Sequence, residues 1–357
     1  MLIIILIEQI LKNYTDIALN EKNLSIIMEK NFVSVITPTY NRGEILKETI
    51  QSVLNQTYQK FEYIIVDDGS TDNTKEIVQS FQDKRIKYIS QQHIGTPASG
   101  RNTGIKNAKG EFIAFLDSDD IWFPQKLEIQ LKEFQKNADI LILATNGILI
   151  PIRPYRKYLT IKKNLVVSFR DLIVNKIIPI INSSVLIKRT AIEAVGLIDE
   201  EHFIRASEDY DYWLRVLKYR DNSILVLKQI LVKYRAHSSN ITIDMFTNSD
   251  FFKKLYERLV YIHGKYEEYD QESLNIKIRE TLYQLRVFKT KESLFQRKVN
   301  INYVLKDKFL KFYDRLWIVF GYINNKYLKF MKDNFFIKKI NKFLYYGKHL
   351  LLNLLMT

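Results

Sequence analysis

The sequence of 357 residues contains no cysteine. Disulfide bonds, thiolate catalysis and zinc sites built on cysteine are therefore excluded. Proline is also scarce, with six residues, of which Pro179 is the last. The chain beyond residue 245 is Lys-rich and aromatic-rich, and we expect it to be helical.

Long hydrophobic runs are missing as well. The apolar start of the chain stops at Glu8, and no later stretch reaches the ~18 uninterrupted apolar residues that a membrane span requires. Residues 1–30 are interpreted as an N-terminal extension. On this basis we expect the active site to be cytoplasmic.

The composition indicates a folded protein with a sizeable core, because 46% of the residues are hydrophobic and 26% are charged. The length favours one large domain, or one domain with an appendage. The formal net charge is +14. This basic excess indicates an anionic partner, which is a membrane surface, a nucleotide or a nucleic acid.

From residue 32 onward, apolar runs typical of strands alternate with amphipathic stretches typical of helices. Such a series predicts an α/β fold, with a mainly parallel sheet between two layers of helices. We assign this fold to residues 31–245 and a helical, basic, aromatic-rich region to residues 246–357. The expected strands are 33–37, 61–66, 86–89, 111–116, 139–143, 180–189 and 224–234. The expected helices are 43–54, 71–81, 98–108, one opening at Pro124, 189–196 and 208–217.

Two of the expected strands run directly into carboxylates. Asp67 and Asp68 follow the strand 61–66, and Asp117, Asp119 and Asp120 follow the strand 111–116. Open α/β sheets bind ligands at the carboxyl ends of their strands. Because two acidic strand ends would crowd negative charge into one crevice, we expect a cation or a hydrogen-bonding ligand there.

Four segments, taken together, resemble one family: TPTYNR (37–42), VDDGSTDNT (66–74), FLDSDDIW (115–122) and SEDYDYW (207–213). In this order and spacing they are similar to the inverting glycosyltransferases of family 2, which have the GT-A fold. The resemblance covers roughly residues 32–240. Each motif alone is weak, whereas the four together, each at an expected strand end or helix start, are specific. The chain departs from the usual pattern at Ser99-Gly100-Arg101-Asn102, where members commonly have Ala before Arg-Asn.

The resemblance implies a nucleotide-sugar site that depends on a divalent metal. A cation such as Mn²⁺ or Mg²⁺ offsets the charge that a diphosphate leaving group gains, and carboxylates suit such hard cations. By resemblance, Asp119 is the metal ligand, Asp117 lies nearer the ribose and Asp68 contacts the base edge. The same nucleotide-sugar site would include Thr37, Pro38, Tyr40, Arg101 and Asn102. Asp67, Asp72 and Asp120 could instead cap turns and helices.

The resemblance also assigns the acceptor side. Sugar transfer needs a base that takes a proton from the acceptor hydroxyl, and the matching residue is Asp209. Trp213 lies four residues later, on the same helix face, and either forms a wall for a sugar ring or packs in the core. Some relatives carry a His at the position of His237 that completes the metal shell or contacts the diphosphate. The alternative is a histidine without a ligand role.

The C-terminal tail, residues 301–357, contains eleven Lys or Arg and three Asp, a net charge of +8, interleaved with aromatic residues. This pattern suits a helix that lies in an anionic membrane interface, and thus a peripheral position on the inner face of the plasma membrane. The alternative is a helical appendage that packs on the catalytic domain. No motif supports binding to nucleic acid.

The sequence therefore predicts a glycosyltransferase that moves a sugar from a nucleotide-diphosphate sugar, most simply a UDP-sugar, to an acceptor hydroxyl. The expected setting is the synthesis of a cell-surface polysaccharide or lipid-linked glycan. A nucleotidyltransferase would need a Gly-rich phosphate loop near the first strand, and residues 37–43 do not form one. A non-catalytic module that binds membrane or nucleotide sugar remains the alternative, although Asp119 and Asp209 are both present.

Overall fold

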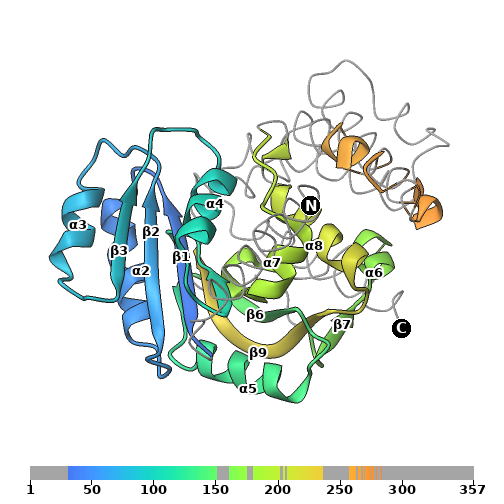
Figure 1. Ribbon diagram of the computed structural model, residues 1–357, viewed down its shortest axis with the longest axis horizontal. Helices are drawn as coiled ribbons and strands as arrows, with labels where there is room; N and C mark the ends of the chain where they lie inside the picture. The colour runs from blue at the N-terminus through green and yellow to red at the C-terminus, as the bar shows by residue number, and fades with distance from the viewer. Residues whose placement is uncertain are drawn as a thin grey trace, which may run out of the picture. The chain divides into compact units, whose positions relative to one another are not determined.

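The computed structural model describes residues 31–150, 161–174 and 180–235, apart from 202, 203 and 206, together with parts of 257–283. The strands are β1 (Val33–Thr39), β2 (Phe61–Asp67), β3 (Ile86–Ser90), β4 (Phe112–Phe115), β5 (Ile121–Trp122), β6 (Ile142–Ile150), β7 (Leu165–Val167), β8 (Leu186–Lys188) and β9 (Ile224–Arg235). The helices are α2 (Gly43–Leu54), α3 (Thr74–Ser80), α4 (Pro97–Asn107), α5 (Lys126–Lys136), α6 (Phe169–Val174), η1 (Asn182–Ser184), α7 (Arg189–Val195) and α8 (Glu208–Tyr219). The fold is thus α/β, as the alternating pattern predicts (Figure 1).

The strands form one mixed sheet in the order β3-β2-β1-β4-β8-β6-β9-β5, and β7 also pairs with β9. Strands β3, β2, β1 and β4 are mutually parallel, and β6 and β9 run in the same direction as these four. The mainly parallel sheet is therefore confirmed. Antiparallel β8 lies between β4 and β6 because the chain returns through α6 and η1 to fill that place.

Helices cover both faces of the sheet. Apolar residues of α2, α3 and α5 pack on one face, and those of α4, α6, α7 and α8 pack on the other. Each face buries its own cluster of side chains. Transfer of this apolar area out of water supplies most of the driving force for folding, at about 25 cal/mol per Å².

Several element boundaries follow the sequence closely, whereas those of two strands do not. The strand predicted over residues 139–143 is β6, which begins at Ile142 and extends to Ile150. Helix α2 spans the predicted residues 43–54, and α7 ends at Gly196, whose φ of +81° suits glycine. The strand predicted over residues 180–189 is reduced to β8. Its first half forms η1 instead, because the Ser184 hydroxyl and backbone N–H both donate to the carbonyl of Ile181.

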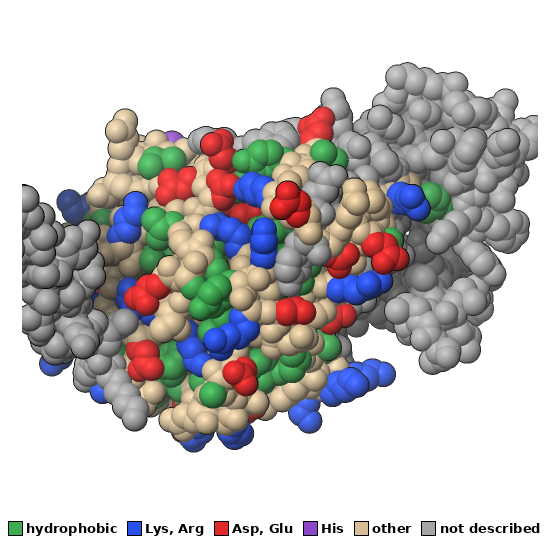
Figure 2. Space-filling view, turned by 45° about the vertical axis from the view of Figure 1, so that its right-hand side comes forward, with side chains coloured by type: hydrophobic (Ala, Val, Ile, Leu, Met, Phe, Trp, Pro, Cys, Tyr) green, Lys and Arg blue, Asp and Glu red, His purple; other side chains and the backbone are tan. Residues whose placement is uncertain are grey.

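The chain divides into two compact units, residues 1–246 with 258–277, and residues 247–257 with 278–357. In the first unit, the Tyr266 hydroxyl donates to Asp211 Oδ1 of α8 at 3.0 Å, and Lys265 Nζ pairs with Asp199 Oδ2 at 2.6 Å. None of the helices in the described part of the chain is long and apolar enough to cross a membrane. The face in Figure 2 carries acidic and basic side chains intermingled.

The predicted N-terminal extension (1–30) and the basic tail (301–357) lie outside the described residues. The division between residues 245 and 246 stays a prediction.

Candidate active site

The candidate site lies where the carboxyl ends of β1, β2 and β4 meet. In the pairing of β1 with β2, Thr39 stands opposite Asp67, and the Asp68 N–H donates to the Thr39 carbonyl at 2.9 Å. On the other side of β1, the Leu116 N–H donates to the Ile36 carbonyl at 3.0 Å. The acidic segments that follow β2 and β4 therefore start at the same edge of the sheet, as expected for a ligand site of this fold class.

The turn after β2 is organised by Asp67. Its Oδ1 accepts the Ser70 N–H at 2.9 Å, and its Oδ2 accepts the Tyr88 hydroxyl at 2.5 Å. Gly69 adopts φ of +79°, which a residue with a Cβ rarely tolerates. Because Asp67 is only 2% exposed, its carboxylate serves the turn rather than a ligand, in agreement with the capping alternative.

Asp68 organises the neighbouring loop. Its Oδ1 accepts from Gln91 Nε2 at 2.8 Å and the Ile94 N–H at 3.0 Å, while its Oδ2 accepts from the Gly95 N–H at 2.8 Å and lies 3.0 Å from His93 Nδ1. With this many protein partners, the carboxylate shapes the loop that follows β3. A contact from Asp68 to a base edge stays a prediction, and in this conformation a base would compete with those donors.

Tyr40 and His93 provide an aromatic surface beside Asp68. The two rings are stacked with centroids 4.1 Å apart, and Tyr40 is 42% exposed. Thr37 lies differently. It is fully buried, and its hydroxyl is 3.0 Å from the Tyr63 hydroxyl, within the cluster beneath α2. Because it is buried, the Thr37 side chain does not line an open pocket. The next residue along the strand points to the opposite face of the sheet. Pro38 faces α4, where a Cβ on Gly100 would meet it at 2.8 Å.

Three carboxylates follow β4 within four residues. Asp117 is about one-third exposed, Asp119 is less exposed and lies 3.7 Å from Arg42 Nη1, and Asp120 is fully buried. Asp120 accepts from the Ser183 hydroxyl at 2.5 Å and from the Arg235 N–H at 3.0 Å. Burial, and then the charges of Asp119 and Asp117, raise the pKa of Asp120 well above its usual value. Asp120 is thus a structural residue, and negative charge is concentrated at this strand end.

Arg101 connects this strand end to α8. Its Nη2 donates to Asp117 Oδ1 at 2.7 Å, and its Nη1 donates to Glu208 Oε1 at 3.1 Å. With its amide oxygen turned toward Arg101, Asn182 also accepts from Nη2 at 2.9 Å and from Nε at 3.0 Å. Burial lowers the pKa of Arg101, but the charges of Asp117 and Glu208 outweigh it and raise the pKa overall.

Asn102 has a different function from the expected one. Its Nδ2 donates to the Ile198 carbonyl and to Glu200 Oε1, both at 2.7 Å, and its Oδ1 accepts the Ile198 N–H at 3.0 Å. The amide is 2% exposed and has these partners on both sides. Asn102 therefore pins the loop after α7 to α4, and its amide is engaged there rather than in a nucleotide pocket.

Asp209 lies in the first turn of α8, directly after Glu208. Its Oδ1 accepts the Tyr210 N–H at 2.8 Å, and the residue is half-buried. Burial raises the pKa of Asp209 to about 6, the charge of Glu208 acts in the same direction, and Arg101 opposes them. A carboxylate with such a pKa can accept a proton near neutral pH.

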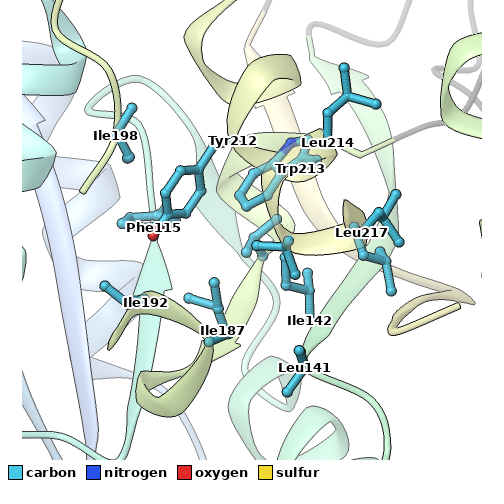
Figure 3. Packing of buried hydrophobic residues seen from close by; sticks show 14 of the residues in the cluster. Phe115, Leu141, Ile142, Ile187, Ile192, Ile198, Tyr212, Trp213, Leu214 and Leu217 are labelled. Carbon is cyan, nitrogen blue, oxygen red and sulfur yellow. The ribbon is translucent and has the colours of Figure 1, made fainter. Parts of the chain in front are cut away.

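Trp213 belongs to the core. It is 2% exposed and packs edge-to-face on Tyr212, with ring centroids 5.6 Å apart. Figure 3 shows it among Leu214, Leu217 and Ile142. The expected wall for a sugar ring is therefore not supported, because the face of α8 that carries Trp213 is turned toward the sheet. His237, the other expected metal ligand, lies outside the described residues.

Comparison with known proteins identifies this arrangement. The sequence model described as Glycosyl transferase family 2 matches residues 34–196. The UDP-Glc:alpha-D-GlcNAc-diphosphoundecaprenol beta-1,3-glucosyltransferase WfgD of Escherichia coli is 33% identical over 219 residues, which cover 61% of this chain and 83% of WfgD. The chain belongs to glycosyl transferase family 2. It is therefore a glycosyltransferase with a nucleotide-sugar-binding fold, and the resemblance seen in the four sequence motifs is confirmed.

Two further proteins are similar to this family 2 chain. The putative teichuronic acid biosynthesis glycosyltransferase TuaG of Bacillus subtilis (strain 168) is 32% identical over 217 residues, or 60% of this chain and 82% of TuaG. The crystal structure of S. aureus TarS 1–349 in complex with UDP superposes with a TM-score of 0.56 at 19% identity, covering 85% of this chain and 92% of that one. The structural similarity to TarS supports the GT-A fold.

Some residues of the site escaped the sequence analysis. No site role was predicted from the sequence for Glu208, Asn182 or His93. Arg42 and Arg235 both lie beside Asp119, whose carbonyl accepts from Arg235 Nε at 2.9 Å. Only Arg42 had a local signal, since it ends the TPTYNR motif. The partners of the other residues lie far away in sequence, where no local pattern points to them.

Proposed function

We propose that this chain transfers a sugar from a nucleotide-diphosphate sugar, most simply a UDP-sugar, to an acceptor hydroxyl with inversion at the anomeric carbon. The proposed setting is the assembly of a cell-surface polysaccharide or a lipid-linked glycan. The observation that carries the proposal is the bridge made by Arg101. This side chain bonds to Asp117, which follows β4, and to Glu208 at the start of α8, where Asp209 also lies.

The relatives support the class of donor and acceptor. The name of WfgD specifies UDP-Glc as the donor and a diphosphoundecaprenol-linked GlcNAc as the acceptor, and TuaG is assigned to teichuronic acid biosynthesis. TarS was crystallised with UDP. The likeness to WfgD and TuaG covers about three-fifths of this chain and more than four-fifths of each relative.

The aromatic surface beside Asp68 supports a nucleotide site. Tyr40 exposes its ring next to His93, and a flat base gains about 1–3 kcal/mol by stacking on an aromatic side chain. The ribose and diphosphate would then extend along the sheet edge toward Asp117 and Asp119. Arg101 holds Asp117 in place for that contact.

A divalent cation fits the donor set after β4. Magnesium is usually bound through one or two carboxylates together with substrate phosphates. No cluster of three or more acidic or histidine ligands exists among the residues that the structure describes, and the partly exposed Asp117 and Asp119 match the smaller set. Burial raises the pKa of Asp120, and the charges of Asp119 and Asp117, which a cation would offset, raise it further. Asp119 would hold the metal, which would neutralise the leaving diphosphate.

Asp209 would act as the base. It accepts the proton of the acceptor hydroxyl as that oxygen bonds to the anomeric carbon and the bond from this carbon to the diphosphate breaks. The nucleoside diphosphate leaves with the electron pair of that bond. Because this is a single displacement, it needs one base and no enzyme nucleophile, and the product is inverted.

The proposal is tested by measuring nucleotide release from UDP-, GDP- and dTDP-sugars in the presence of GlcNAc-diphosphate-lipid acceptors. We expect acceptor-dependent release of UDP, and an inverted anomeric configuration of the product by NMR. The matched control is Asp209→Asn, which keeps the shape of the side chain and removes its basicity. Release of no nucleotide above this control, or a retained configuration, would contradict the proposal.

A further inference from the structure

Arg101 joins three elements that are distant in sequence. It lies on the second turn of α4, is 5% exposed, and reaches Asp117 after β4 with one nitrogen and Glu208 of α8 with another. These partners are 16 and 107 residues away from it. A planar guanidinium with two carboxylate partners fixes direction as well as distance, because its N–H groups point along set axes.

Glu208 is not accounted for by a position at a helix start alone. The dipole of α8 favours acidic residues in its first turn, and Glu208, Asp209 and Asp211 all lie there. Glu208, however, is 5% exposed, and its Oε1 is bonded to Arg101. Its Oε2 is buried without a hydrogen-bond partner in the described structure. A buried carboxylate in this state is unfavourable unless its charge is paired, and the charge of Arg101 provides that pairing.

Asp209 itself has no hydrogen bond to β4 or α4 among those of the described residues. Its Oδ1 is bonded to the N–H of the next residue, so its position follows that of the first turn of α8. Glu208, in the same turn, is connected through Arg101 to Asp117, beside the proposed site of the sugar donor. A displacement of this turn would move the base relative to the donor, and an error of about 1 Å in such geometry lowers rates by roughly 10²-fold.

We propose that Glu208 is a positioning residue: through Arg101 it holds the first turn of α8 against the carboxyl end of β4, and so sets where Asp209 stands relative to the sugar donor. This inference rests on the proposed function. In this role Glu208 touches neither the donor nor the acceptor, and it affects the reaction only through the position of Asp209.

The test compares Glu208→Ala with wild type, using the nucleotide sugar that gives the fastest turnover and, separately, UDP alone in calorimetry. We expect kcat to fall by roughly 10²-fold. The Kd of UDP and the KM of the donor should stay unchanged, because Arg101 keeps its bond to Asp117. Glu208→Gln, whose amide oxygen can still accept from Arg101, should recover part of the lost kcat.

A double-mutant cycle separates positioning from loss of structure. In an Asp209→Asn background, Glu208→Ala should have little further effect, because residues that act as one unit are not additive. Asp211→Asn is the matched control, since Asp211 is also buried on α8 but bonds to Tyr266 instead of the donor side. It should lower the melting temperature and leave kcat unchanged.

The possible outcomes are distinct. If wild type releases nucleotide and Glu208→Ala has the same kcat, the inference is wrong while the proposed function stands. Additive losses with Asp209→Asn, a loss of UDP affinity, or an equal loss of kcat in Asp211→Asn would each overturn it as well. If wild type releases no nucleotide from any donor, the proposed function itself fails.

Discussion

Asp209 should make the reaction sensitive to pH. Burial and the charge of Glu208 raise the pKa of Asp209 to about 6, and only the ionised carboxylate can accept the acceptor proton. As the pH falls through this value the base becomes protonated, so kcat/KM should decrease below about pH 6 and level off above it. Initial rates across this range at constant ionic strength measure the profile.

The control for this profile is Asp209→Asn. It should bind UDP like wild type, transfer sugar on the order of 10²–10⁴-fold more slowly, and lose the inflection near pH 6. A variant that keeps the same pH profile would mean that another group takes the proton.

Asp119 is expected to make transfer depend on a metal. Chelation should stop transfer, and Mn²⁺ or Mg²⁺ should restore it. Asp119→Asn should slow transfer by roughly 10²-fold, because an amide replaces the anionic ligand of a cation that contributes several kcal/mol. The affinity for UDP should rise on addition of Mn²⁺ in wild type but not in this variant. Undiminished activity in excess chelator would rule out the metal-dependent mechanism.

Trp213 gives a test of core packing against sugar binding. Since Trp213 is 2% exposed, Trp213→Ala should lower the free energy of unfolding by about 3–5 kcal/mol and leave the UDP affinity of the folded protein unchanged. Trp213→Phe keeps part of the packing and should cost less. Denaturant unfolding and calorimetry measure the two quantities. Wild-type stability combined with a loss of donor affinity would restore the sugar-wall interpretation.

Among the elements, α4 depends on its close approach to β1. A Cβ added at Gly104 would stand 2.3 Å from Ile36 Cγ2, and one at Gly100 would stand 2.8 Å from Pro38 Cβ. The two glycines are four residues apart and thus lie on one face of the helix. They let α4 lie directly on β1, the strand that carries Thr37 and Pro38 and leads into Tyr40, with Arg101 beside them.

Gly104→Ala should therefore lower the free energy of unfolding by about 1–3 kcal/mol, because overpacking forces the core to shift. The matched control is Gly264→Ala, where a Cβ would meet no atom of the described residues within 4 Å. It should be neutral, or stabilising by about 0.4–1 kcal/mol. Thermal unfolding of both variants checks the contrast, and equal losses would mean that backbone flexibility, and not the contact with Ile36, decides the effect.

For the whole molecule, the basic tail carries a prediction that the described residues do not test. With a net charge of +8, residues 301–357 should bind anionic lipid, because each basic residue near such a surface contributes about 1 kcal/mol. Binding should weaken as salt shortens the Debye length.

Co-sedimentation with liposomes containing phosphatidylserine should capture the intact chain more strongly than residues 1–300. Liposomes of phosphatidylcholine alone are the control. Equal behaviour of the two chains on both liposomes would indicate that the tail packs within the protein instead.

Local sequence did not predict β5, β7 or α6, but it was enough for most of the other strands and helices, for the two acidic strand ends and for the family. These features depend on neighbours within a few residues: the period of apolar side chains, the Gly69 turn and the capping of helices. The boundaries of α2 and the end of α7 at Gly196 follow from the same short-range rules.

Other features required the folded chain. Antiparallel β8 fills the place between β4 and β6, Asn102 bonds to residues 96 and 98 positions away, and Glu208 meets Arg101 across 107 residues. Trp213 likewise faces the core because α8 packs on the sheet, whose strands come from distant parts of the sequence. The packing of elements against one another decides which side of a helix is buried. It also decides which distant carboxylate a buried arginine meets. No local sequence pattern contains that information.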